Sequence, residues 1–213
     1  MSCSTVWGLR YSVRDAIPKK QTPRQNLDSL RNYAEKKAEY PDATFLAEDE
    51  AVLLSVPTIT RMWAAKGVQP IIPTRFGTKE RRTLFGAINL KRGILTGQIA
   101  ETGNTRTFQT FLSLIRKRYP RGRIIMILDN VRFHHAKAIQ KSLKQYPRLS
   151  FLFLPPYYPK LNPQEMVWQI LRRNVTHNTY YPTFAQEVAA AKRFFKNAVI
   201  DIKNSPTSLI IRN

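Results

Sequence analysis

The chain has one cysteine and few acidic residues. Cys3 alone among 213 residues cannot form an intramolecular disulfide, and the lack of cysteine clusters argues against a structural zinc site. There are 14 aspartates and glutamates against 35 lysines and arginines, which gives a formal net charge of +21. Such a charge predicts a polyanionic partner, because lysines and arginines that contact phosphates release condensed counterions.

Long apolar runs are also missing. No stretch approaches the roughly 20 residues that span a bilayer, and the N-terminal segment lacks the hydrophobic region of a signal peptide. We therefore expect a soluble, cytoplasmic protein with no membrane partner. The length and a hydrophobic content of 43% predict one folded domain with a full core.

The chain divides into three parts. Residues 1–41 are expected to form a basic arm or linker with a short helix, residues 42–200 the main domain, and residues 201–213 a poorly structured tail. The arm combines prolines with cations that we expect to contact DNA, namely Lys19, Lys20 and Arg24.

The main domain alternates strand and helix patterns. We expect strands at 43–48, 82–89, 94–100, 124–128 and 150–154, and helices at about 108–119, 139–146, 163–171 and 184–200. This order predicts an α/β fold with a mixed sheet flanked by helices. The fully apolar run at 124–128 suits a central parallel strand.

Three carboxylates follow rigid elements in a region with few acids. Between residues 51 and 200 the acids are Glu80, Glu101, Asp129, Glu165 and Glu187. Asp129 follows the apolar run RIIMIL, and Asp49 ends a similar run, so both are expected at the carboxyl edge of the sheet, where open α/β folds bind ligands. Glu165 is expected in the first turn of a helix that begins at Pro163.

Clustered carboxylates in a basic protein predict a site for Mg²⁺, which prefers carboxylate oxygens, water and phosphate. Two such ions about 4 Å apart support in-line displacement at phosphorus without a side-chain nucleophile. Asp49 and Asp129 would bind both ions and Glu165 would complete one coordination shell, and Mn²⁺ can substitute. His134 or His135 could contact a phosphate or act as an auxiliary acid.

Each of these acids has a simpler interpretation. Asp129 could cap a helix or form a turn, and Glu165 could stabilise the helix dipole. Glu48 and Glu50 compete with Asp49 for its role. Trp168 could stack on a base, but its helical spacing from Glu165 favours core packing.

Three sequence blocks resemble those of mariner-superfamily transposases, specifically the bacterial and archaeal insertion-sequence branch with a DDE endonuclease domain. LPPYYPKLNPQEMVW at 154–168 resembles the block LPPYSPxLNPIExxW, and LDNVRFHHAK at 128–137 resembles the DNxxxH block. AEDE at 47–50 resembles the block of the first catalytic aspartate, and RMWAAKGVQPIIPT resembles the segment that follows it. The blocks have the right order, with 35 residues between Asp129 and Glu165.

The resemblance implies a ribonuclease-H-like fold and the catalytic set Asp49, Asp129 and Glu165, with Asn130 and His134 at auxiliary positions. It implies Mg²⁺-dependent cleavage at transposon ends, strand transfer into TA sites, a homodimer on double-stranded DNA and a place near the prokaryotic nucleoid. Cations beside the blocks are expected to contact DNA, namely Arg132, Lys137, Arg172 and Arg173.

The sequence departs from the family at Tyr158, Lys160, Gln164 and Met166, none of which is an expected metal ligand. Family members also carry helix-turn-helix modules that bind the transposon ends, whereas a basic arm stands in their place here. We therefore expect a catalytic half, either partnered by a separate N-terminal half or left as a truncated remnant.

Two other functions remain open from the sequence. One is a catalytically inactive remnant that binds DNA without recognising transposon ends. The other is a ribonuclease-H-like nuclease that acts on branched DNA or RNA–DNA hybrids, which the fold permits.

Overall fold

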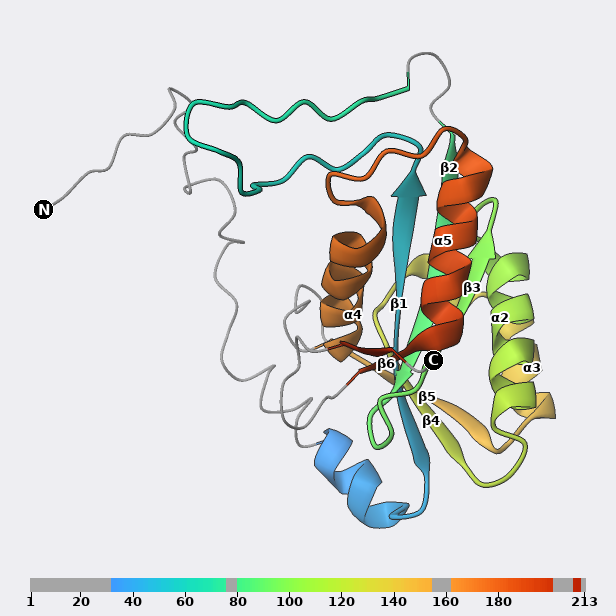
Figure 1. Ribbon diagram of the computed structural model, residues 1–213. Helices are drawn as coiled ribbons and strands as arrows, with labels where there is room; N and C mark the ends of the chain where they lie inside the picture. The colour runs from blue at the N-terminus through green and yellow to red at the C-terminus, as the bar shows by residue number, and fades with distance from the viewer. Residues whose placement is uncertain (1–31, 76–79, 155–161, 201–208, 212–213) are drawn as a thin grey trace, which may run out of the picture.

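The computed structural model describes residues 32–75, 80–154, 162–200 and the backbone of 209–211. A five-stranded mixed sheet forms its centre (Figure 1). The strand order is β3-β2-β1-β4-β5, with bounds β1 (Thr44–Leu54), β2 (Arg81–Asn89), β3 (Leu95–Ala100), β4 (Ile124–Leu128) and β5 (Leu149–Phe153). The first three strands form an antiparallel meander, and β4 and β5 run parallel to β1. The predicted mixed α/β sheet is confirmed.

Helices cover both faces of this sheet (Figure 1). The front face, as we name it, packs against α4 (Pro163–Leu171), the π-helical turn η4 (Arg172–Thr176) and α5 (Phe184–Asn197). The rear face packs against α2 (Thr105–Arg118), the 3₁₀ turn η2 (Arg132–His135) and α3 (Lys137–Gln145). A helix at residues 32–39 lies beside the start of β1, where Tyr33 packs edge-on against Phe45.

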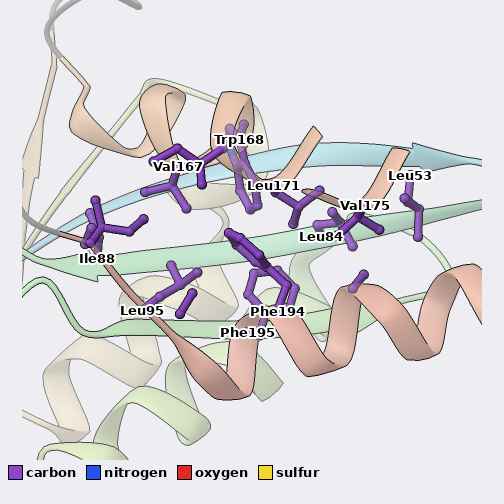
Figure 2. Packing of buried hydrophobic residues seen from close by; sticks show 14 of the residues in the cluster. Leu53, Leu84, Ile88, Leu95, Val167, Trp168, Leu171, Val175, Phe194 and Phe195 are labelled. Atoms are coloured by element: carbon purple, nitrogen blue, oxygen red, sulfur yellow. The ribbon is translucent and has the colours of Figure 1, made fainter. Parts of the chain in front are cut away.

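The front core is the apolar cluster between the sheet and the α4–α5 layer (Figure 2). Trp168 lies at its centre and meets Phe195 edge-on, with ring centroids 6.2 Å apart. Gly86 and Gly97 are paired across β2 and β3, and a Cβ on either would overlap Trp168 or Phe195 respectively. The two glycines therefore let the aromatic layer approach the sheet closely.

Local sequence signals explain where the helices begin. Asn104 forms a capping box with Thr107 at the start of α2, and Asn162 caps α4 directly before Pro163. Thr183 caps α5 by accepting a hydrogen bond from the Gln186 amide. Strand β4 is buried along its whole length, as its apolar run predicts.

Two predicted boundaries are wrong. Strand β1 continues to Leu54 instead of ending near residue 48, because the alternation of inward side chains resumes at Leu53 and β2 pairs with it throughout. Helix α5 ends at Asn197, and Ala198–Ile200 forms strand β6, which pairs with β7 (Leu209–Ile211) in the predicted unstructured tail. Ile94 also bridges Val199, so this ladder is tied to the hairpin.

An irregular segment at residues 55–75 leaves the end of β1 and reaches beyond the sheet (Figure 1). Its apolar side chains are largely exposed, with Trp63 fully accessible and Ile71 87% exposed. Arg75 returns the segment to the body by donating hydrogen bonds to the Ser55 carbonyl and to Glu187. Across the described part of the chain, every helix is too short or too polar to cross a membrane.

Candidate active site

Asp49 lies in the middle of β1, on the front face. The Trp168 indole N–H donates a hydrogen bond of 3.1 Å to Asp49 Oδ2, so α4, which covers the front face, positions this carboxylate. The prediction that Asp49 ends a strand is wrong, because the strand continues for five residues. Its position relative to β4 is nevertheless the expected one, since the β1–β4 ladder ends at the pair Ala47 and Ile127.

Asp129 follows β4 directly and is two residues beyond Ile127, as Asp49 is two residues beyond Ala47. Its side chain is 48% exposed, and Oδ1 accepts a 3.1 Å hydrogen bond from the Val131 amide. Asp129 thus forms the local turn of the simpler interpretation, and its side chain is half exposed at the end of β4. The two aspartates mark the point where the paired parallel strands separate.

Electrostatic repulsion connects these acids. Burial raises the pKa of the Asp49 carboxyl to about 7, with the Glu50 and Asp129 charges adding to the increase. Hydrogen bonds from the backbone and from Trp168 act in the opposite direction. A carboxylate so destabilised gains from a cation placed at its free oxygen.

Glu165 lies in the first turn of α4, as predicted, and its side chain is 39% exposed. Arg172 Nη1 lies 3.8 Å from Glu165 Oε1. Asn162, at the start of the same helix, accepts from the Gln164 amide and donates 2.8 Å to the Glu48 carbonyl. These bonds fix the start of α4 against β1, next to Asp49.

The three predicted catalytic carboxylates do not gather to metal-binding distance in the described structure. One group of potential ligands does so there: Glu48, Glu50 and His134 offer atoms within 4.8 Å of one another. Glu48 and Glu50 point to the rear face, because side chains alternate along β1. The assignment of Asp49, Asp129 and Glu165 as catalytic residues stays a prediction.

The auxiliary residues surround the end of β4. The Asn130 side chain donates 2.7 Å to the Leu154 carbonyl, which links the ends of β4 and β5. His134 is completely buried, and His135 stacks on Phe153 with ring centroids 4.4 Å apart. His134 is therefore not a surface histidine, and its ring nitrogens contact the Asp129 carbonyl oxygen and Glu50.

Four of the cations predicted to contact DNA follow Asp129 or Glu165 closely in the sequence. Arg132, Lys137 and Arg173 are exposed, and Arg172 is partly exposed beside Glu165. Lys19, Lys20 and Arg24 lie outside the described residues, as do Tyr158 and Lys160. Exposed cations next to carboxylates suit a phosphate backbone that approaches the same edge.

Sequence reasoning missed how the site is supported. Trp168 is buried in the core as predicted, but its hydrogen bond to Asp49 was not foreseen. Gly86, the cross-strand partner of Asp49, was also overlooked. A glycine inside an apolar strand pattern signals close approach of another element and could have indicated this contact.

Fold and site together define the class: a ribonuclease-H-like domain with acids at the edge where β1 and β4 separate. The family model for the DDE superfamily endonuclease matches residues 44–186, two thirds of the chain, and the chain belongs to this family. This match confirms the DDE endonuclease domain that the three sequence blocks predict.

Individual relatives agree with this assignment. The insertion element IS630 uncharacterized 39 kDa protein of Shigella sonnei is 28% identical over 166 residues, covering 76% of this chain and 46% of the relative. The uncharacterized protein y4pE/y4sA of Sinorhizobium fredii (strain NBRC 101917 / NGR234) is 30% identical over 102 residues, 47% of this chain and 73% of that protein. The chain thus spans about half the length of the insertion-element relative.

Solved structures share the fold at low identity. The Mos1 transposase paired-end complex with the left transposon end superposes with a TM-score of 0.62 at 15% identity, covering 92% of this chain and 59% of that one. The catalytic domain of Mos1 mariner transposase gives 0.56 at 13% identity, with 90% and 87% covered. The described fold therefore corresponds to nearly the whole of that catalytic domain.

Proposed function

We propose that this domain cuts DNA at the ends of an insertion element and joins the released 3′ ends to target DNA. The observation that carries the proposal is the edge where β1 and β4 separate, with Asp49 and Asp129 at matching positions and Glu165 on the adjoining helix. TA target sites and terminal inverted repeats are the substrates we expect from the family.

Asp49, Asp129 and Glu165 are the residues that would hold divalent metal. Their oxygen donors suit Mg²⁺ or Mn²⁺, and the burial and repulsion that raise the pKa of Asp49 favour a cation there. Two bound ions would activate the attacking oxygen and stabilise the leaving one. Trp168 orients Asp49, and Asn162 fixes the helix that carries Glu165. Mos1 structures with Mg and with Mn support this choice by analogy.

Double-stranded DNA is the proposed partner, bound at the nucleoid through the exposed cations near the acidic edge. A homodimer on DNA would supply the two active sites needed to join two transposon ends. The exposed apolar side chains of residues 55–75 support assembly, because such surfaces often mark interaction sites. Recognition of the ends would come from a helix-turn-helix part carried by a separate half.

The test is nicking of a supercoiled plasmid in Mn²⁺ or Mg²⁺ by the wild type, Asp129→Asn and Glu165→Gln. We expect nicking by the wild type and a loss of at least about a thousandfold in both variants, in the range that removal of a catalytic group produces. DNA binding, followed by mobility shift, should be nearly unchanged because the basic surface is intact.

Either of two results would contradict the proposal. Equal nicking by Asp129→Asn would exclude its catalytic role. Inactivity of all three proteins, with DNA still bound and also after addition of an N-terminal half, would support the inactive remnant. Joining of a 3′-OH donor strand to the plasmid would separate a transposase from a nuclease for branched DNA or hybrids.

A further inference from the structure

Three side chains meet behind β1, on the face opposite Asp49. His134 Nε2 lies 3.1 Å from Glu50 Oε1 and 3.8 Å from Glu48 Oε2. One ligand atom from each residue falls within 4.8 Å of the others. The residues come from two elements, the middle of β1 and the η2 turn after β4, so the tertiary fold creates the cluster.

The hydrogen bond on the far side of His134 determines which nitrogen is free. Nδ1 lies 3.1 Å from the Asp129 carbonyl oxygen, which can only accept, so Nδ1 carries the hydrogen and donates it. In neutral imidazole Nε2 then has a lone pair. This lone pair faces the carboxylates of Glu48 and Glu50. Three hydrogen-bond acceptors therefore lie together, and none of the three groups supplies a hydrogen to the others when both acids are ionised.

The surroundings make this convergence costly. Glu48 and His134 are completely buried, and neither Glu48 carboxylate oxygen has a hydrogen-bond partner among the described residues. Phe108 and Phe133 enclose the His134 ring, with centroids 4.4 and 4.6 Å away. Burial, followed by the charges of Glu50, Asp49 and Asp129, raises the pKa of Glu48 well above its usual value.

Lysine and arginine do not relieve the repulsion. In the described part of the chain, the ion pairs of Glu48 and Glu50 are those with His134 alone. A buried carboxylate without a compensating partner costs several kcal/mol, on the order of the stability of a small domain. Either protons or a metal ion must occupy the space between these acceptors.

We propose that Glu48, Glu50 and His134 bind a divalent transition-metal ion behind β1, at a site separate from the predicted catalytic carboxylates. One imidazole nitrogen with two carboxylates favours Mn²⁺ or Zn²⁺ over Mg²⁺. Histidines that bind metals commonly donate their other N–H to a carbonyl, as His134 does. The bound ion would therefore fix the backbone that carries Asp129. The inference depends on this cluster and not on DNA cleavage.

The test uses Asp49→Asn with Asp129→Asn, a double variant that removes two of the three predicted catalytic ligands. Mn²⁺ binding is followed by electron paramagnetic resonance, and thermal unfolding is measured with and without Zn²⁺. We expect the double variant to retain one Mn²⁺ and to show a Zn²⁺-dependent rise in Tm. Adding Glu48→Gln should lower Mn²⁺ affinity at least tenfold and abolish that rise.

Glu187→Gln on the same double variant is the matched control, because Glu187 is also a buried glutamate but lies at α5. It should leave Mn²⁺ binding unchanged. Circular dichroism checks the fold, and Glu50→Gln, at the more accessible ligand, replaces Glu48→Gln if that variant does not fold.

Two outcomes would overturn the inference. A double variant that binds no Mn²⁺ and shows no Zn²⁺ effect means that shared protons fill the cluster. Mn²⁺ binding that persists in both Glu48→Gln and Glu50→Gln places the ion elsewhere. Absence of plasmid nicking by the wild type with the ion still bound would contradict only the proposed DNA cleavage.

Discussion

The two faces of β1 hold acidic side chains in opposite surroundings. On the front face, Asp49 receives a hydrogen bond from Trp168 and lies two residues beyond the last pair of the β1–β4 ladder, as Asp129 does. On the rear face, Glu48 accepts no hydrogen bond from any described residue and lies near His134, whose ring packs against Phe108. Neighbouring residues of one strand thus acquire different chemistry, because the layer that covers each face decides which partners a carboxylate meets.

The close packing of α4 against Gly86 on the front face offers the strongest test. A Cβ at Gly86 would overlap Gln164 and Trp168, so Gly86→Ala should lower the free energy of unfolding by about 3 kcal/mol or more, as overpacked cores do. Urea unfolding measures this loss. Gly97→Ala, which overlaps Phe195 instead, should destabilise similarly yet retain more nicking, because Trp168 still reaches Asp49. Equal nicking losses would contradict the separate role of Gly86.

Glu187 is a buried acid that, unlike Glu48, has an arginine beside it. Burial raises the pKa of Glu187 to about 7, although Arg75 Nη2 lies 3.4 Å away and opposes the increase. The Glu187 carboxyl then binds more protons in the folded state than in the unfolded state between pH 4.5 and 7. Its contribution to the free energy of unfolding is therefore greatest below pH 4.5 and is lost as the pH rises through 7. The fall is at most about 3 kcal/mol.

Glu187→Gln should reduce the pH dependence of the free energy of unfolding measured from pH 4.5 to 8, and should leave the part that Asp49, whose pKa is also about 7, contributes. Burial, followed by the Glu187 charge, raises the pKa of Tyr181 above its usual value, so this phenol does not titrate in the same range. A variant with the same pH slope as the wild type would show that Glu187 is not the titrating group.

The indole donor can be removed while most of the packing is kept. Trp168→Phe loses the bond to Asp49, so the pKa of Asp49 should rise further above 7. A bond to a charged group contributes about 1.5 kcal/mol or more, so Mn²⁺ affinity and nicking at pH 7 should fall about tenfold. The pH profile of nicking should shift upward. Phe195→Leu, which changes the neighbouring ring, should leave the profile in place.

The smallest expected effect concerns the start of α4. Asn162→Ala removes both the helix cap and the bond to the Glu48 carbonyl, and should cost about 1–2 kcal/mol. Asn162→Ser keeps a capping oxygen without the amide donor, so its loss should be smaller. Thermal unfolding of Asn162→Ser beside the wild type isolates the contribution of the link to β1, and identical Tm values for these two proteins would mean that the link contributes nothing.

Much of the sheet was predictable because its strands have clear local patterns. The apolar run of β4 and the hairpin of β2 and β3 gave correct elements, and the Asn162–Pro163 cap gave the start of α4. The length of β1 was not predictable from its acidic centre, since pairing with β2 overrides the interruption of the apolar pattern. Strand β6 was missed because the apolar pattern of α5 continues to Ile200, and the strand is defined by pairing with β7 and with the distant Ile94.

The candidate site was predictable only in part. The positions of Asp129 and Glu165 on their elements follow from motif and spacing. Which face each acid of Glu48–Glu50 occupies depends on the register of β1 against β4, which no local pattern specifies. The burial of His134 and the reach of Trp168 require the packed helices and could not be read from the chain.

The pleat of β1 also constrains how this gene can change. One residue inserted between Ala47 and Glu48 would exchange the faces of all three acids at once. Asp49 would then point to the rear face, and Glu48 and Glu50 to the front face that Trp168 covers. The irregular segment at 55–75 pairs with no strand of the sheet over its length and has no such restriction. Among descendants of this sequence, lengths should therefore vary between β1 and β2 but stay invariant within the seven residues that begin at Thr44.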